Sequence, residues 1–235
     1  MERVFVVDRE AFFGGDWPQG CVRLDDTDAF LAAARAHGRF VPRDQAEQTP
    51  AWKQWIPYCM LRCGDWSDAA DDGAPDRGLF LVQRTKKQRE ARLHESWSIG
   101  LGGHIEPMDD GPGGPAPPEG AGAFFIRALW RELTEELRLP TTGVDSAPLP
   151  PPRLVGLIND DSTPVGKVHA GLAYCLDVPW PLPRARETVG IREISKMRGG
   201  FTSLVEFAKL WQTPSRFESW SQFLIQAEVV GAKGG

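Results

Sequence analysis

The chain lacks the features that mark secreted, membrane-embedded or nucleic-acid-coating proteins. Its four cysteines (Cys21, Cys59, Cys63 and Cys175) have neither the spacing of a disulfide framework nor that of a zinc site. No apolar run approaches the length of a membrane span. The formal net charge of -5 argues against a protein that coats nucleic acid. We therefore expect a cytoplasmic protein that binds neither a membrane nor a long nucleic acid.

Regular patterns are also missing along the 235 residues. There is no internal repeat, and strands and helices do not alternate in the way that produces a doubly wound parallel sheet. The segment GLGG at 100–103 lacks the strand–helix context and spacing of a dinucleotide fingerprint. The length and the hydrophobic fraction of 41% still fit one large globular domain with a sizeable core.

Strand-like and helix-like segments are mixed, which predicts an α+β domain of layered sheet and helices. The expected strands are 3–13, 55–63, 79–85, 154–160 and 168–178. The expected helices are 25–38, with Asp26 or Thr27 as its cap and Gly38 at its end, then 124–139, 202–212 and 213–226, the last with Thr213 as its cap and Pro214 in the first helical position.

Three glutamates crowd into five positions of the expected helix 124–139. At about 100° per residue, the apolar stripe of this helix consists of Ile126, Leu129, Trp130, Leu133 and Leu137. Glu132, Glu135 and Glu136 then share a neighbouring arc. Because like charges repel, this arc is either a solvated acidic face or the place where a hard divalent cation binds.

The segments GGHIEP (102–107) and RELTEEL (131–137) together resemble the Nudix box of the Nudix hydrolase family. The family pattern is a glycine, five residues, a glutamate, seven residues and then Arg-Glu-aliphatic-x-Glu-Glu-x-Gly-aliphatic. More narrowly, segments 92–105, 156–174 and 218–221 resemble a little-characterised bacterial Nudix subgroup of predicted phosphoesterases.

The box departs from the family pattern at three points. Arg138 stands where the family has a glycine. Gly103 and Arg131 are 131 − 103 = 28 positions apart, so about 14 residues are inserted, and the Gly/Pro-rich composition of about 109–122 predicts a loop. The first glutamate of the pattern falls on Asp109 counted from the front. Counted back from Arg131 it falls on Ala123, with Glu119 as the nearest acid, and its place stays open.

The resemblance implies an α/β/α sandwich built on a mixed sheet. We expect an N-terminal extension at 1–70, the Nudix domain at 71–198 with its box at 102–139, and C-terminal helices at 199–235. The implied reaction is hydrolysis of a phosphoanhydride in a nucleoside diphosphate linked to another group, with Mg²⁺ or Mn²⁺ as the cofactor. The implied partner is a small phosphorylated metabolite or nucleotide, and the family also forms homodimers.

The resemblance assigns roles to particular residues. It implies that Glu132, Glu135 and Glu136, with the carbonyl of Gly102, ligate the metal, and that Arg131 orients the acidic cluster. A further base or ligand would come from Glu193, Asp161 or Glu106, with Asp160 and Glu187 as additional candidates. The segment 158–161 is as readily a turn.

Substrate contacts are expected from Gly103, His104, Arg92 and His169. A histidine beside a strand is also common as a structural residue. The basic segment 86–92 would bind a phosphate or lie in an exposed loop. Two other functions remain open at this point: a Nudix-fold binding module without turnover, and an isoprenoid diphosphate isomerase. The isomerase requires a cysteine near the glycine loop, where none of the four cysteines lies.

Overall fold

The computed structural model describes residues 2–14, 17, 19–66, 75–84, 96–111, 120, 122–140, 148–192, 194–195 and 197–231. These residues form two compact units. Unit 1 comprises Met1–Tyr58, Gly102–Glu132 and Leu154–Tyr174, and unit 2 comprises Cys59–Leu101, Leu133–Arg153 and Cys175–Gly235. The predictions for Arg92, Glu193, Glu119, residues 86–89 and most of the loop 109–122 lie outside the described residues.

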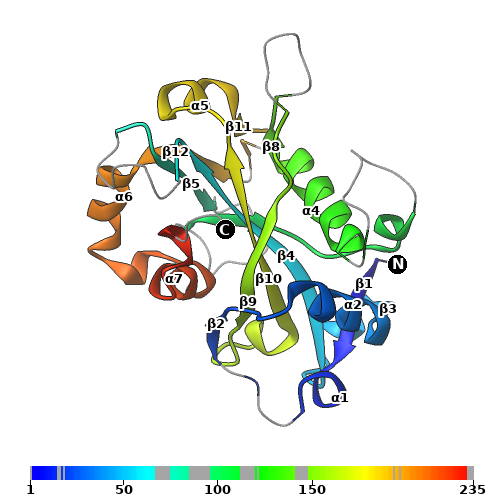
Figure 1. Ribbon diagram of the computed structural model, residues 1–235. Helices are drawn as coiled ribbons and strands as arrows, with labels where there is room; N and C mark the ends of the chain where they lie inside the picture. The colour runs from blue at the N-terminus through cyan, green and yellow to red at the C-terminus, as the bar shows by residue number, and fades with distance from the viewer. Residues whose placement is uncertain are drawn as a thin grey trace. The chain divides into compact units, whose positions relative to one another are not determined.

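Five elements contribute residues to both units. Four of them are labelled in Figure 1: β4 (Trp52–Cys63), β9 (Arg153–Asn159), β10 (His169–Val178) and helix α4 (Ala123–Glu136). The fifth is the short strand β7 (Gly100–Gly102). Nearly every residue of β4 and β10 is buried, so most of their side chains are apolar. The buried polar exceptions are Lys53, Gln54, Arg62 and His169. Cys59, Leu61 and Cys63 of β4 are fully buried, and so is Met60 between them.

Unit 1 is built on strands that pair antiparallel. Strand β1 (Arg3–Asp8) pairs with β3 (Arg39–Pro42) and with the start of β4, where Val6 lies opposite Gln54. The order continues from β4 through β10 and β9 to β2 (Gly20–Val22), with Gly20 opposite Asn159. The apolar residues Val4, Val6, Val41 and Ala46 form a buried cluster against which Trp52 packs.

Two helices of unit 1 begin after a capping aspartate. Helix α2 (Thr27–His37) begins after Asp26, whose carboxylate accepts from the Ala29 amide at 2.9 Å, and ends at Gly38, as predicted. The segment 3–13 is only partly a strand, contrary to the prediction. Asp8 caps a short helix α1 (Arg9–Phe13) by accepting from the Ala11 amide, which ends β1. Helix α3 (Arg43–Ala46) and the 3-10 helices η2 (Pro107–Asp110) and η3 (Gly166–Val168) complete the unit.

Unit 2 contains β5 (Gly78–Arg84), which pairs antiparallel along its whole length with β12 (Met197–Ser203) and at its start with the end of β4. The short strands are β6 (Trp97–Ser98), β7 (Gly100–Gly102), β8 (Leu137–Arg138) and β11 (Gly190–Ile191). The helices are α5 (Leu182–Thr188), α6 (Leu204–Trp211), α7 (Ser219–Gln226) and the 3-10 helices η4 (Pro214–Arg216) and η5 (Val229–Gly231).

Two predicted helices are shorter in the structure. The helix predicted at 124–139 ends at Glu136, because Leu137–Arg138 pairs with β11 and the Arg192 amide donates to the Glu136 carbonyl at 2.8 Å. The helix predicted at 213–226 is interrupted at Phe217. This buried residue has extended backbone and makes a parallel bridge to Trp97, so the segment divides into η4 and α7.

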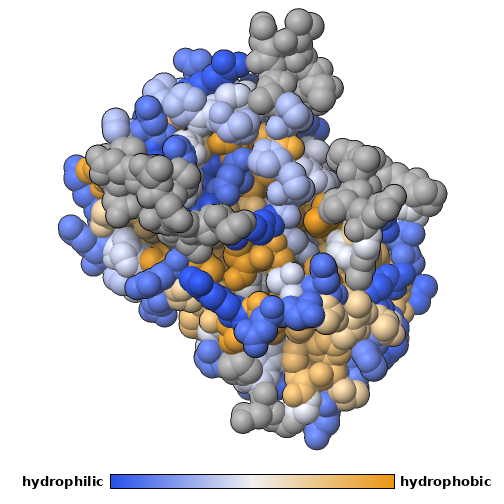
Figure 2. All heavy atoms as spheres, in the orientation of Figure 1, coloured by the Kyte–Doolittle hydropathy of each residue, from blue (hydrophilic) through white to orange (hydrophobic). Residues whose placement is uncertain are grey.

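Few large hydrophobic side chains are highly exposed among the described residues. On the face drawn in Figure 2, hydrophilic side chains border several hydrophobic areas. The exposed large hydrophobic residues are Met108, Ile194 and Val205, and single apolar residues of this kind are normal on a globular surface. No helix within the described ranges has the length and apolar character that crossing a bilayer requires.

Candidate active site

Two adjacent glycines, Gly102 and Gly103, stand at the end of strand β7, and a different close approach requires each of them. A Cβ atom on Gly102 would lie 2.0 Å from the backbone oxygen of Pro57. A Cβ atom on Gly103 would lie 2.2 Å from the carboxylate carbon of Glu132 and within 2.4 Å of both its oxygens. The glycine loop and helix α4, separated by the Gly/Pro-rich insertion in sequence, therefore meet where Glu132 lies against Gly103.

Arg131 joins these two halves of the motif through four hydrogen bonds. Its Nε and Nη2 atoms donate to the two carboxylate oxygens of Asp109 at 2.9 and 3.0 Å. Nη2 also donates to the His104 carbonyl at 2.7 Å, and Nη1 donates to Glu132 Oε1 at 2.7 Å. Burial alone would lower the pKa of this guanidinium, but Asp109 and Glu132 raise it above its usual value. Arg131 is a fixed cation that positions the glutamate.

Asp109 is six positions after Gly103, where the family pattern, counted forward from that glycine, has its first glutamate. It is 5% exposed, and its Oδ2 also accepts from the Glu106 amide at 2.8 Å, at the start of η2. The Arg127 guanidinium donates to its backbone carbonyl at 2.8 Å. The carboxylate of Asp109 thus ties the loop after Gly103 to helix α4, and the large insertion follows it in sequence.

The three box glutamates lie on one helix with the spacing i, i+3 and i+4. Such residues occupy neighbouring positions on a helix face. Glu132 is in unit 1 with 15% of its side chain exposed, whereas Glu135 and Glu136 form the last turn of α4 and belong to unit 2. The apolar stripe that orients the helix is also as predicted, since Leu129, Leu133 and Leu137 are fully buried.

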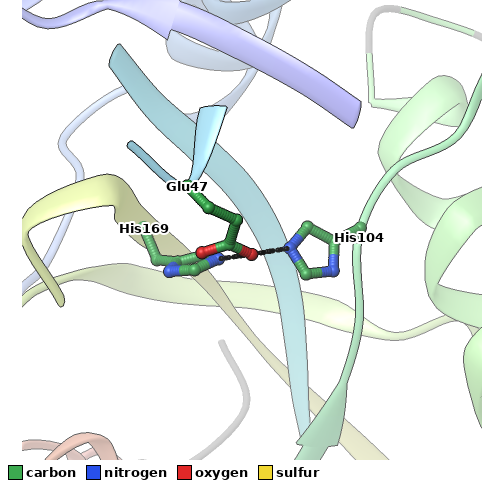
Figure 3. A group of neighbouring side chains, drawn as sticks. All are labelled: Glu47, His104 and His169. Carbon is green, nitrogen blue, oxygen red and sulfur yellow. Dashed lines mark hydrogen bonds and ion pairs between the residues drawn. The ribbon is translucent and has the colours of Figure 1, made fainter. Parts of the chain in front are cut away.

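A second group of side chains converges in unit 1 from three separate elements (Figure 3). His104 follows the glycine pair, His169 begins β10, and Glu47 follows α3. The Nε2 atoms of the two histidines are 3.2 Å apart, and Glu47 Oε1 is 3.9 Å from each of them. Burial, together with the charges of His169, Arg43 and Arg131, lowers the pKa of His104 well below its usual value. Both histidines were predicted as substrate contacts, whereas Glu47 was not.

Asp161 is held in a network around the buried ammonium of Lys53. Lys53 Nζ donates to Asp161 Oδ1 at 2.6 Å and to Asn159 Oδ1 at 2.8 Å, as well as to the Gly166 carbonyl at 2.7 Å. The other carboxylate oxygen of Asp161 accepts from Arg9. Burial lowers the pKa of Lys53. Asp161 lies in the turn after β9, so the turn interpretation agrees with the structure, and its role as a base stays a prediction that these ion pairs disfavour.

Comparison with known proteins places this geometry in a family. No protein-family profile matches the chain. Protein YmaB of Bacillus subtilis (strain 168) is 32% identical to it over 199 residues, which cover 83% of this chain and 80% of YmaB.

The solved structure of Tm1382, "a putative Nudix hydrolase", has a TM-score of 0.67 and 24% sequence identity, and the match covers 97% of this chain and 98% of Tm1382. This similarity confirms the predicted α+β fold with a mixed sheet and its likeness to Nudix proteins. The chain therefore belongs to the family of protein YmaB and has the Nudix fold.

Proposed function

We propose that this protein is a divalent-metal-dependent hydrolase that cleaves a phosphoanhydride in a nucleoside diphosphate linked to another group, or in a related small diphosphate. The observation that carries the proposal is that the Glu132 carboxylate lies directly against Gly103. Arg131 donates hydrogen bonds both to this carboxylate and to the His104 carbonyl. A solvated acidic helix face would not need a glycine opposite one of its glutamates or a buried arginine beside it.

The residues fit a hard divalent cation. Three carboxylates on one helix face and a backbone carbonyl offer only oxygen atoms, which Mg²⁺ and Mn²⁺ prefer. The missing Cβ at Gly103 leaves the space that the Glu132 carboxylate occupies. Glu132, Glu135 and Glu136, with the Gly102 carbonyl, would hold the ion. When bound, it would lower the pKa of a water molecule and neutralise phosphate oxygens.

The remaining side chains have positioning roles in this proposal. Arg131 holds Glu132 in one rotamer and balances the charge of the carboxylates. Asp109 in turn fixes the guanidinium plane through two parallel hydrogen bonds, a geometry that specifies orientation as well as charge. Because Gly103 has no side chain, the Glu132 carboxylate can lie against the backbone of the loop. A substrate diphosphate would lie beside these groups, where small errors in position cost large factors in rate.

The pKa values of the cysteine thiols do not support the alternative function as an isoprenoid diphosphate isomerase, which requires a catalytic cysteine. Burial raises the pKa of Cys63 and of Cys175 to about 12 and that of Cys21 to about 11. Burial also raises the pKa of Cys59 well above its usual value. A nucleophilic or acid–base cysteine needs a lowered pKa, which none of these thiols has. Cys59, Cys63 and Cys175 are buried core residues, and Cys21 is half-buried.

The test is a hydrolysis screen of the purified chain against nucleotide sugars, dinucleoside polyphosphates, ADP-ribose and nucleoside triphosphates, with Mg²⁺ or Mn²⁺ and product identification. We expect at least one diphosphate-linked compound to be split at its phosphoanhydride, and a chelator to stop the reaction. Tight binding in calorimetry without any turnover would replace the hydrolase with a binding module. Turnover that survives the chelator would contradict the role of the metal.

A further inference from the structure

Glu47, His104 and His169 have the arrangement of a metal site whose ligands are different residues from the box glutamates. Their closest ligand atoms define a triangle with sides of 3.2, 3.9 and 3.9 Å. The point equidistant from the three corners of that triangle lies about 2.1 Å from each atom, which is the distance of Zn²⁺ from imidazole nitrogen and carboxylate oxygen. The nitrogen–nitrogen separation of 3.2 Å matches one edge of a tetrahedral coordination shell, about 3.3 Å for bonds of this length, whereas Glu47 would have to move closer to the two nitrogen atoms than 3.9 Å to complete that geometry.

His169 is oriented for this task by the backbone. Its Nδ1 atom is 2.8 Å from the Val165 carbonyl oxygen, so Nδ1 carries the proton and Nε2 presents its lone pair toward His104 and Glu47. A backbone carbonyl on the far nitrogen is the usual outer partner of a metal-ligating histidine. Val165 precedes η3, which leads directly into β10, and His169 is only 7% exposed.

Hydrogen bonding within the group does not account for the position of Glu47. At 3.9 Å its oxygen is too far from either ring nitrogen for a hydrogen bond. Arg43 Nε donates to Glu47 Oε1 at 3.4 Å, and this long and exposed pair lies on the same helical turn. Such pairs contribute little, so Glu47 can turn toward a cation at small cost.

We propose that Glu47, His104 and His169 bind one zinc-class divalent ion, with a fourth position open to water or to an anionic oxygen. Two imidazoles and one carboxylate suit Zn²⁺, Co²⁺ or Fe²⁺, in contrast to the oxygen-only set of the box. The open position follows from the exposure of Glu47, whose side chain is 34% accessible. The same ion would fix the loop that carries the His104 carbonyl, to which Arg131 donates.

The proposal is tested with Co²⁺ alone as the probe. Protein stripped by a chelator is titrated with Co²⁺ in millimolar Mg²⁺, which competes for the carboxylates of the box. We expect one Co²⁺ per chain with visible absorption of a low-coordinate site, displaced by Zn²⁺. X-ray absorption on the zinc form is expected to show two imidazole ligands.

Substitutions of two of the three residues test whether that signal comes from this group. Glu47→Ala and His104→Ala should each weaken Co²⁺ binding by about 100-fold or more, since loss of an outer-shell partner alone costs about 10–100-fold. His37→Ala, an exposed histidine of α2, serves as the matched control and should bind as the wild type does. Glu47 is exposed at the end of a helix, so Glu47→Ala is expected to fold, as circular dichroism will verify.

The outcomes separate this site from the proposed hydrolase centre. Glu136→Gln should lose hydrolysis and keep the Co²⁺ signal. The Co²⁺ readout does not depend on which substrate the protein hydrolyses. The proposal is overturned by a stoichiometry of zero at micromolar Co²⁺, by unchanged binding in both Glu47→Ala and His104→Ala, or by loss of the signal in Glu136→Gln.

Discussion

Arg131 and Asp109 form a two-pronged ion pair, with Nε–Oδ1 and Nη2–Oδ2 distances of 2.9 and 3.0 Å, across 22 positions of the sequence. Both side chains are largely buried, with 14% and 4% exposed. The pair lets the box tolerate its insertion, because Asp109 anchors the loop before the inserted residues and Arg131 anchors the helix after them.

Asp109→Ala is therefore expected to destabilise the protein more than loss of a surface charge would. The substitution leaves the buried guanidinium of Arg131 without two of its acceptors, and breaking a buried pair in this way costs about 3 kcal/mol. Urea unfolding measures the loss. Asp110→Ala is the matched control, since Asp110 pairs with Arg35 at the surface and should cost less than about 1 kcal/mol. Equal losses in the two variants would show that the pair has no special role.

Gly103→Ala should separate activity from stability. The new methyl group would displace the Glu132 carboxylate, the flexible end of a side chain, so the free energy of unfolding should change by less than about 1 kcal/mol. Hydrolysis should fall by about 100-fold, the usual effect of misplacing a catalytic group by an ångström. The kinetic constants kcat and KM measure the change in activity, and the denaturation midpoint measures the change in stability, each compared with the wild type.

Two other glycines provide controls for that substitution. Gly200→Ala meets nothing within 4 Å and should leave both quantities unchanged. Gly102→Ala places its methyl group against the backbone of Pro57 and should cost about 2 kcal/mol of stability, because backbone must move. Full activity in Gly103→Ala would remove Glu132 from the proposed centre.

Asp161→Asn should change how stability depends on pH. Burial alone would raise the pKa of Asp161, but its hydrogen bond and charge interaction with Lys53, aided by Asn159 and Arg9, hold the pKa below its usual value. The resulting stabilisation is complete above the unfolded-state pKa, about 3.9, and is lost as the pH falls through the lower folded-state value.

The variant should therefore unfold more easily at pH 7 and lose less stability than the wild type as the pH falls from about 4 to about 2. Unfolding by urea at a series of pH values gives both curves. Parallel curves for the wild type and Asp161→Asn would mean that the Lys53 network does not act on this carboxylate.

The sequence predicts the parts of this protein whose signals are local. The apolar period of helix α4 and the cap at Asp26 each act within a few residues, and the structure confirms them. The end of α4 was not predictable, because Leu137–Arg138 becomes a strand only by pairing with Gly190–Ile191, about fifty residues later.

The candidate sites divide in the same way. The box glutamates share one helix, so their spacing alone indicates their proximity. His104 and His169 were each identified singly, but 65 positions separate them and no local pattern indicates that their Nε2 atoms meet. Glu47 lies outside every recognised motif, and only the fold brings it to the two histidines. The contact between Asp109 and Arg131, which favours the count forward from Gly103, is likewise visible only in the fold. The domain boundaries, the homodimer and the cytoplasmic location stay predictions.

The most direct test of the central claim is the hydrolysis rate of Glu136→Gln at saturating Mg²⁺, measured on the best substrate from the screen beside Glu10→Gln, an exposed glutamate of α1. We predict that Glu136→Gln loses activity by at least about 100-fold, as removal of a principal charge-stabilising group does, while Glu10→Gln retains the wild-type rate. Wild-type turnover in Glu136→Gln would show that the carboxylates of α4 do not hold the ion that the reaction needs.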